Sequence, residues 1–394
     1  MSWITPHTSR TRVLGVALAT LPLVATAALA APQAGASASR GDGFRAAVNK
    51  TLAAPSGRPA GNPGVRVATD YRLIHSGLDN PRQISLTRGG GLIVAEAGHG
   101  SYNEDRCQGG TCVGYSSQVT LFRNGHKRTI MDHLISGAGA DGSFAIGVDG
   151  AGKRPGGPFV GIETWAPRQA LPPGVNGKRL GKLLARDLPD GSTHIIANVT
   201  GFEQRHDPDG EGFDSDPYSV LALGNQVLVA DAAGDSILSY RGGRLHLWKA
   251  LPDPGPRIDP VPTVISRGGN GHVYVGTLWS ERPGKARVFE YTRAGRLLHV
   301  YRGFTTITGV AAKANGTLYV SELFGGCKGG GPQCTPGRVV KANTGHGRVH
   351  MRVPFPAGIV ARGGRTQVAA WSVAPAIGFG GDPDTSGAIW RLRF

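Results

Sequence analysis

An internal repeat constrains the fold of this chain more than any other feature of its sequence. Each copy has a short apolar segment, a tight turn, and a second apolar segment that ends in Val and a small residue. The clear copies span 80–98, 216–234, 261–278 and 307–323, and weaker copies span 142–163 and 356–372. The turns in the clear copies are Gly-Gly, Gly-Asn or Asn-Gly pairs, which tolerate positive φ and close two-residue hairpins. The sequence therefore predicts six units that each begin with a β-hairpin.

The spacing of the copies indicates the size of each unit. Equivalent Val or Ala residues stand at positions 94, 160, 229, 275, 320 and 369, so the intervals are 66, 69, 46, 45 and 49 residues. Each interval accommodates a four-stranded sheet, and such sheets arranged radially form a propeller. An unclosed sandwich and a β-solenoid are the alternatives, but solenoid rungs are usually shorter. We predict an all-β fold, a six-bladed β-propeller of four-stranded antiparallel blades.

The ends of the repeat region suggest how the ring closes. Apolar segments at 70–77 and 387–394 flank the six copies. We expect the N-terminal segment to pair with the last blade as its outermost strand, because this pairing removes an exposed sheet edge.

The sequence changes character twice before the propeller. Residues 1–30 hold two arginines and then an uncharged apolar run that ends in Ala-Leu-Ala, which is typical of a cleaved signal peptide. A retained transmembrane anchor is the alternative, but this run contains Gly and Pro and is short for a span. Residues 31–65 are rich in Ala, Gly, Ser and Pro, as in a flexible linker. We predict a secreted, extracellular protein whose propeller spans 66–394, with no transmembrane anchor after processing.

The charge distribution bears on the partners of the protein. The formal net charge is +16, but Lys and Arg are scattered and are not interleaved with aromatic residues along any predicted strand. This pattern argues against a specific nucleic-acid site. It favours non-specific attraction to an anionic cell surface. We expect a monomer that binds a small molecule or a cell-surface ligand.

Long connections gather at one end of the predicted blades, and carboxylates gather with them. In repeat proteins this end is usually the binding side. Polar loops carry acids in any case, but four acids stand at equivalent positions, each at the end of a second strand. These candidate ligand or metal residues are Glu96, Glu163, Asp231 and Glu322. We predict that they ring the mouth of the central channel.

The segment HDPDGEGFDSD forms a second acidic candidate. Its members are His206, Asp207, Asp209, Asp214 and Asp216. The segment departs from the EF-hand template, because Gly210 stands fourth instead of sixth and Tyr218 replaces the Glu expected at position twelve. Another calcium geometry and a metal-free loop of Asx-turns are both open. A lone loop histidine such as His206 is more often solvated than catalytic.

Four cysteines lie in the same set of long loops. An even number of cysteines in an exported protein indicates disulfides. Gly-rich spacers favour the local pairs Cys107–Cys112 and Cys327–Cys334. The alternative is a zinc site of four thiolates, but the six-residue spacer of the second pair exceeds the usual spacing of zinc ligands.

Several phrases resemble the ScyD/ScyE family of secreted bacterial propellers. They include LGKLLARDLPDGS, GFEQRHDPDG, DSDPYSVLAL and VLVADAAGDSIL within 180–238, and the similarity extends from about Leu73 to the C-terminus. The resemblance implies export and a six-bladed propeller of the wider NHL-like and lactonase-like group. It implies no settled reaction.

Three functions are compatible with these features. The first is a ligand-binding or scaffold propeller that uses its acidic, long-loop face. The alternative is a metal-dependent, lactonase-like hydrolase with a divalent ion such as calcium at the channel mouth, which would activate water or polarise a carbonyl. A streptogramin-lyase-like enzyme needs a His and Glu base pair, and the acidic loop offers a single His. The sequence assigns no catalytic residue, so it leaves open whether the protein is an enzyme.

Overall fold

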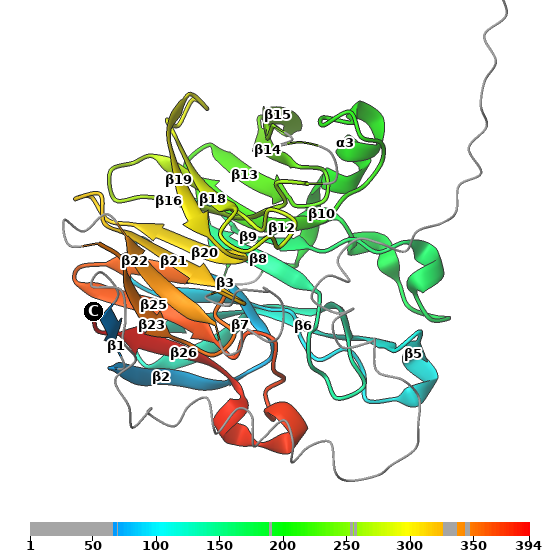
Figure 1. Ribbon diagram of the computed structural model, residues 1–394. Helices are drawn as coiled ribbons and strands as arrows, with labels where there is room; N and C mark the ends of the chain where they lie inside the picture. The colour runs from blue at the N-terminus through cyan, green and yellow to red at the C-terminus, as the bar shows by residue number, and fades with distance from the viewer. Residues whose placement is uncertain are drawn as a thin grey trace, which may run out of the picture.

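Six antiparallel sheets stand around a central axis in the computed structural model (Figure 1). The structure describes residues 66–68, 70–188, 191–252, 255, 258–325, 337–342 and 347–394. The predicted signal peptide at 1–30, the predicted linker up to residue 65, and Cys327 and Cys334 lie outside the described residues. The predicted fold, a six-bladed propeller of four-stranded antiparallel blades, is confirmed.

The first three blades follow one another along the chain. Blade 1 contains β3 (Pro81–Leu86), β4 (Leu92–Glu96), β6 (Thr111–Arg123) and β7 (His126–Ala138), with the short β5 (Cys107–Gln108) beside β6. Blade 2 contains β8 (Val148–Lys153), β9 (Phe159–Glu163), β10 (Lys182–Arg186) and β11 (His194–Asn198). Blade 3 contains β12 (Pro217–Leu223), β13 (Gln226–Asp231), β14 (Ser236–Arg241) and β15 (Arg244–Ala250).

The other three blades complete the ring. Blade 4 contains β16 (Pro262–Arg267), β17 (Val273–Thr277), β18 (Ala286–Tyr291) and β19 (Leu297–Phe304). Blade 5 contains β20 (Ile307–Ala312), β21 (Leu318–Glu322), β22 (Arg338–Ala342) and β23 (Val349–Arg352). Blade 6 contains β24 (Ile359–Arg362), β25 (Arg365–Ala370) and β26 (Gly387–Leu392), and its fourth strand is β2 (Tyr71–Leu78).

The hairpin of blade 3 shows why the repeat folds as it does. Leu223 pairs with Gln226 across the two-residue Gly-Asn turn, and Pro217 pairs with Asp231 at the other end. All residues of β13 after Gln226 are buried. A strand that is covered on both faces needs an unbroken apolar run, which is what VLVA supplies.

The hydrophobic core lies between neighbouring blades. The largest cluster joins Leu228 of blade 3, Val275 and Phe289 of blade 4, and Val320 of blade 5. Burying one such side chain contributes about 1.5–3 kcal/mol. The ring is therefore held together by contacts between neighbouring blades, whose contacting residues lie tens of residues apart in the sequence.

Strand β2 closes the ring as predicted. It pairs antiparallel with β26, and the rings of Tyr71 and Trp390 stack with centroids 3.8 Å apart. The structure adds a strand that the sequence did not predict. Strand β1 (Arg66–Ala68) runs parallel to β23 on the outside of blade 5.

Short helices occur in the connections between strands. Helix α3 (Val199–His206) links blades 2 and 3 and follows the N-cap Asn198, whose side chain accepts from the Gly201 N–H at 2.8 Å. The 3-10 helices are η1 (Glu104–Arg106), η2 (Arg168–Ala170), η3 (Gly177–Arg179), η5 (Phe379–Gly381) and η6 (Pro383–Thr385). None of the helices in the described ranges is long and apolar enough to cross a membrane.

Candidate binding sites at the two ends of the channel

The four predicted channel-mouth carboxylates are buried, and each is held within its own part of the ring. Glu96 accepts from the Asp79 N–H at 2.9 Å, from the Gln118 amide at 3.0 Å, and from the hydroxyl of Thr120. Asp231 accepts from the Asp216 N–H at 2.6 Å.

Glu322 and Glu163 follow the same pattern. Glu322 accepts from the Thr305 N–H at 3.0 Å and from the guanidinium of Arg338. Glu163 accepts from the Ile135 N–H at 2.6 Å, while its second oxygen is buried and has no hydrogen-bond partner in the part of the chain that the structure describes. In three of the four blades the donor lies just before the first strand. The repeated acid therefore satisfies a backbone N–H where the chain enters the blade, and such buried groups need a partner.

The structure does not bring these four carboxylates together. In the described part of the chain, the group of acids spaced to hold a metal ion consists of Glu203, Asp207 and Asp209. No three of the predicted four form such a group there. A divalent ion shared by the four at the channel mouth stays a prediction.

Arg82 is buried on an inner strand, at the end of the channel where the four predicted carboxylates lie. Nε of Arg82 is 3.5 Å from Oδ1 of Asp149, and another guanidinium N–H donates to the carbonyl of Ala145. Burial raises the pKa of Asp149 to about 7, although the Arg82 charge opposes the shift. Arg82 comes from β3 and Asp149 from β8, two of the innermost strands. The positive charge of Arg82 therefore lies beside the Asp149 carboxylate at the end of the channel where a metal ion was predicted.

The residues of the predicted acidic loop have different surroundings. Asp216 is buried and accepts from the Thr164 hydroxyl at 2.9 Å, and burial raises its pKa well above the usual range. His206 is exposed, its Nδ1 lies 2.9 Å from the Phe202 carbonyl oxygen, and the two rings stack. Asp214 is half-buried. The His206 ring is thus engaged by its own helix.

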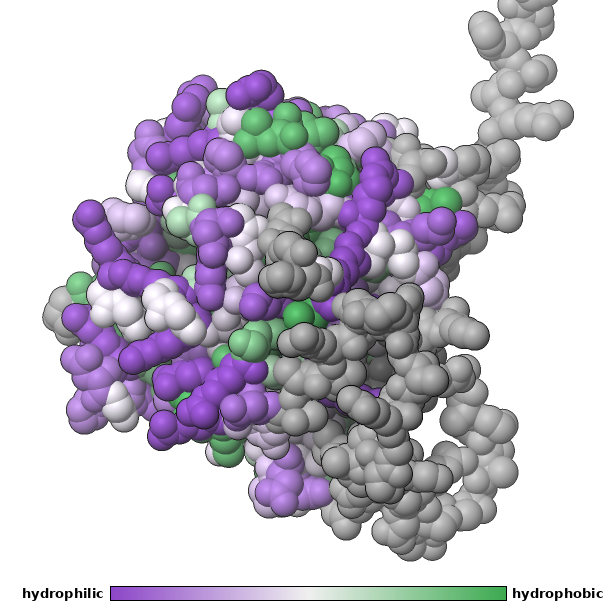
Figure 2. Space-filling view, turned by 60° about the vertical axis from the view of Figure 1, so that its left-hand side comes forward, coloured by the Kyte–Doolittle hydropathy of each residue, from purple (hydrophilic) through white to green (hydrophobic). Residues whose placement is uncertain are grey.

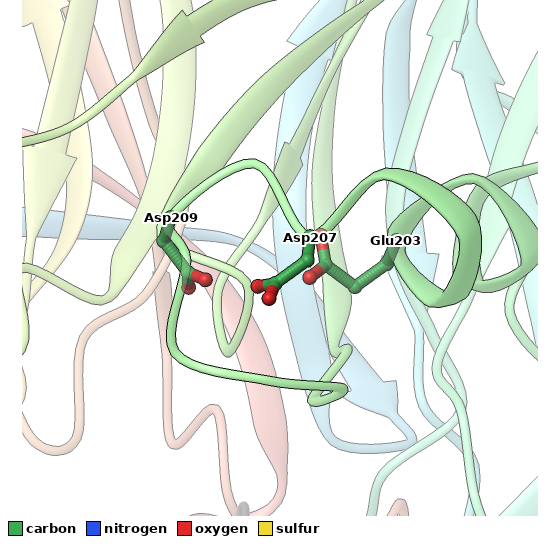
Figure 3. A group of neighbouring side chains, drawn as sticks. All are labelled: Glu203, Asp207 and Asp209. Carbon is green, nitrogen blue, oxygen red and sulfur yellow. The ribbon is translucent and has the colours of Figure 1, made fainter. Parts of the chain in front are cut away.

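Asp207 and Asp209 lie close to a third carboxylate, that of Glu203 (Figure 3). Glu203 is fully buried on α3, and burial raises its pKa to about 8, with the charges of Asp231 and Asp209 adding to the shift. Glu203 was not predicted as a site residue, because it precedes the acidic segment. The four-residue spacing from Glu203 to Asp207, one helical turn, is the signal that could have found it.

A cavity of about 1140 Å³ opens at the opposite end of the channel. Its walls include buried apolar residues of the inner strands, such as Ile84, Ile265, Val310 and Ala312. Among the described residues, its lining contains seven Lys or Arg side chains and no Asp or Glu: Arg88, Arg123, Arg128, Lys153, Arg154, Arg267 and Arg362. The sequence placed the binding side on the acidic long-loop face, whereas this cavity lies on the face of the short hairpin turns.

The cations of the cavity come from turns of several blades. Arg154 donates to the Gly224 carbonyl at 3.3 Å, and Arg362 donates to the Arg88 carbonyl at 3.4 Å, so both side chains bridge neighbouring blades. Burial lowers the pKa of Lys153. Five of the seven are exposed, which leaves their charges accessible to a ligand.

The surface in Figure 2 is mostly hydrophilic. Apart from the parts covered by grey atoms, apolar side chains form only small, separate patches on this face. Such small patches are normal on a soluble protein and mark no apolar docking surface.

Solved structures similar to this chain are propellers of unrelated functions. They include virginiamycin B lyase from Staphylococcus aureus (10% identity, 77% of this chain and 82% of that chain covered, TM-score 0.35). They also include the PQQ-bound aldose sugar dehydrogenase from Streptomyces coelicolor (9% identity, 83% and 98% covered, TM-score 0.41). A third is a chain of the nidogen/laminin complex (11% identity, 66% and 86% covered, TM-score 0.41). Neither protein-family models nor the sequences of curated proteins gave a match. At these similarities the comparisons assign no function to this chain.

Proposed function

We propose that this protein is an extracellular ligand-binding propeller whose basic cavity takes a ligand with several anionic groups. The observation that carries the proposal is the set of seven Lys and Arg side chains around one cavity, with no acid among the described residues of its lining. The proposal keeps the binding role expected from the sequence but moves the ligand from the acidic face to the basic one.

Electrostatics supports an anionic ligand. A concave site lined by charges of one sign concentrates counter-ions and accelerates their association. Arginine, which supplies six of the seven cations, has a planar fork of donors that matches carboxylate, phosphate or sulfate oxygens. The cations come from different blades, so a ligand with two or more separated anionic groups would use them best.

Hydrogen bonds hold the inner strands that form the floor of the cavity in place. Buried Ile265 and Val310 lie among polar side chains of the inner strands, such as Gln83 and Ser85. Gln83 already exchanges two hydrogen bonds with the backbone of Val220, at 2.8 and 3.0 Å, and Ser85 donates to the Ala151 carbonyl at 2.8 Å. These bonds stiffen the floor of the cavity, and a preorganised site loses less entropy on binding.

The extracellular location rests on sequence and on one covalent bond. The signal-peptide pattern at 1–30 and the resemblance to ScyD/ScyE propellers indicate export. The disulfide Cys107–Cys112, predicted from the sequence and formed in the structure, is typical of an oxidising compartment. We assign no reaction, because the Arg82–Asp149 pair supplies a positive charge at the channel end where the hydrolase alternative needs its metal.

Calorimetric titration with defined anions tests the proposal. The probes are tripolyphosphate and trigalacturonate, with maltotriose as the uncharged counterpart of the second. We expect both anions to bind, with affinity that falls as salt rises because exposed charges are screened. Arg267→Ser and Arg362→Ser should each weaken binding at least tenfold. Absence of binding of both anions at millimolar concentration would overturn the proposal.

The hairpin of β24 and β25 supplies a matched control. Arg362 and Arg365 pair across the same turn, but only Arg362 lines the cavity. Arg365→Ser removes the same charge and should leave the affinity within twofold of the parent. Equal losses for the two variants would show that net charge, not the cavity, attracts the anion.

A further inference from the structure

Helix α3 and the loop after it bring three carboxylates together on the acidic face. The helix ends at His206, and Asp207 follows in the left-handed region with φ 43°. The N–H of Asp207 still donates to the Glu203 carbonyl at 2.9 Å, which fixes the two residues one turn apart. Ligand oxygens of Glu203, Asp207 and Asp209 lie within 4.8 Å of one another. Figure 3 shows the three side chains directed into the same space.

The loop backbone holds two of these carboxylates in place. Oδ1 of Asp207 accepts from the N–H groups of Gly210 and Gly212, both at 3.1 Å. Oδ1 of Asp209 accepts from the Glu211 N–H at 3.0 Å. These bonds orient Asp207 and Asp209 but do not by themselves require a ligand, since Asx-turns are common in loops.

Glu203 is the observation that points to a ligand. Its side chain is fully buried, and neither carboxylate oxygen has a hydrogen-bond partner among the described residues. In the described part of the chain, no Lys, Arg or His forms an ion pair with Glu203, Asp207 or Asp209. A buried carboxylate without partners is strongly unfavourable unless it is protonated or meets a cation. Because the Glu203 side chain points toward two further carboxylates, a bound cation is favoured over a bound proton.

Gly234 gives the Glu203 carboxylate the room that it occupies. A Cβ at position 234 would lie 2.5 Å from Oε2 of Glu203 and 3.2 Å from the Asp214 carbonyl oxygen. Gly234 belongs to the loop between β13 and β14 of blade 3, whereas α3 leaves blade 2. An ion bound here would therefore link the connection between blades 2 and 3 to the β13–β14 loop of blade 3.

We propose that Glu203, Asp207 and Asp209 form a calcium-binding site on the acidic face. Carboxylate oxygens are hard ligands of the kind that calcium takes at 2.3–2.6 Å, so two ligands of one calcium lie at most about 5 Å apart. Within the described ranges, the group spaced to hold an ion contains no nitrogen or sulfur ligand of the kind that zinc prefers, and the nearby His206 ring stacks on Phe202. Magnesium demands a stricter octahedral geometry, which a loop with one helical ligand is less suited to impose.

This calcium site is separate from the basic cavity. Asp231 stands at the end of β13 that pairs with Pro217, and Gly234 follows in the next loop, whereas the cavity is lined by Ala222 near the other end of β12. Loss of calcium binding and loss of anion binding can therefore be measured independently.

Calcium titration of the full chain after treatment with a chelator tests the site. We expect one calcium per chain by calorimetry, and a melting temperature several degrees higher in calcium chloride than in chelator, because a ligand of the native state stabilises it. Glu203→Gln and Asp209→Asn should each weaken calcium binding at least tenfold. Magnesium should bind at least tenfold more weakly than calcium.

The matched control is Asp384→Asn. Asp384 is an exposed acid in the long loop between β25 and β26. Its replacement by Asn removes the same charge from the same end of the molecule. Its calcium affinity should equal that of the parent. In chelator, Glu203→Gln should melt at or above the parent, and in calcium the order should reverse, which a merely structural role for Glu203 would not produce.

Two results would overturn the site. One is a parent protein that neither binds calcium nor changes its melting temperature at millimolar calcium. The other is an unchanged calcium affinity in both Glu203→Gln and Asp209→Asn. Equal affinities for magnesium and calcium would overturn the assignment to calcium.

Discussion

Nε of Arg82 lies 3.5 Å from Oδ1 of Asp149, and the two side chains join the innermost strands of blades 1 and 2. Both are almost fully buried, with 5% and 1% of their surfaces exposed. A buried ion pair of this kind is weak evidence for stability, but removing one partner leaves the other charge uncompensated.

The first prediction concerns this pair. Asp149→Leu should lower the free energy of unfolding by about 3–5 kcal/mol, because Arg82 stays charged and buried. The double variant Arg82→Leu with Asp149→Leu should recover a large part of that loss. Urea denaturation followed by tryptophan fluorescence at pH 8 measures both. If the two single losses simply add in the double variant, the residues are not coupled.

The second prediction concerns Glu163 and pH. Burial raises its pKa to about 7, from an ordinary value of 4.5, so the folded state binds its proton more tightly than the unfolded state. The contribution of this group to stability is therefore greatest below about pH 4.5 and is lost as pH rises to about 7. The whole change is about 3 kcal/mol by linkage.

Glu163→Gln isolates this contribution. The variant should gain stability relative to the parent as pH rises from 4.5 to 7, because its side chain does not titrate. Denaturation at several pH values in this window gives the difference between the two proteins. A difference that stays constant with pH would contradict a raised pKa at Glu163.

The third prediction concerns the disulfides. Cys107 and Cys112 close a loop with a sequence separation of 5, so replacing both by Ser should cost about 2 kcal/mol, the entropy expected for a short loop. Peptide mapping without reduction should recover these two cysteines in one fragment. The same map tests the predicted Cys327–Cys334 bridge, and a fragment that links Cys112 to Cys327 would exclude both local pairs.

The fourth prediction concerns Gly358, where blade 6 meets blade 1. A Cβ there would lie 2.7 Å from the Arg82 carbonyl oxygen, 2.8 Å from Cα of Gln83 and closer still to the backbone nitrogen of Ile84, so the backbone of β3 would have to shift. Gly358→Ala should therefore destabilise the protein by 3 kcal/mol or more, beyond the ~1–3 kcal/mol typical of overpacking by a side chain. Gly224→Ala is the control, since nothing lies within 4 Å of its Cβ and its φ is not positive. Equal melting temperatures for the two variants would refute this tight contact.

The architecture could be predicted because each blade carries the same local signals. The two-residue turn at Gly224 and the apolar run around Val229 fall where the structure has a turn and a buried strand. The pairing of 70–77 with the last blade could be predicted because an unpaired edge is unfavourable. Strand β1 could not, because three residues in a Gly- and Pro-rich region carry no strand pattern.

The candidate sites were harder to predict, for two physical reasons. The repeat predicted that Glu96 and Asp231 stand at the ends of second strands, as they do in the structure, but it could not show that each accepts a hydrogen bond from a nearby backbone N–H. The cavity cations, such as Arg88 and Arg267, are scattered along the chain and converge only when the blades are arranged in a ring. Sequence alone placed them among scattered surface charges.

The pairing of β2 with β26 has a consequence for the order of events during synthesis. The partner of Tyr71 is Leu392, so β2, the outermost strand of the last blade, has no partner strand until the C-terminal residues have been made. Contacts between such distant residues require the closure of a very long loop, which slows folding. Strand β2 therefore stays unpaired until nearly the whole chain has been synthesised. A ring completed in this way separates the synthesis of the chain from its final folding step.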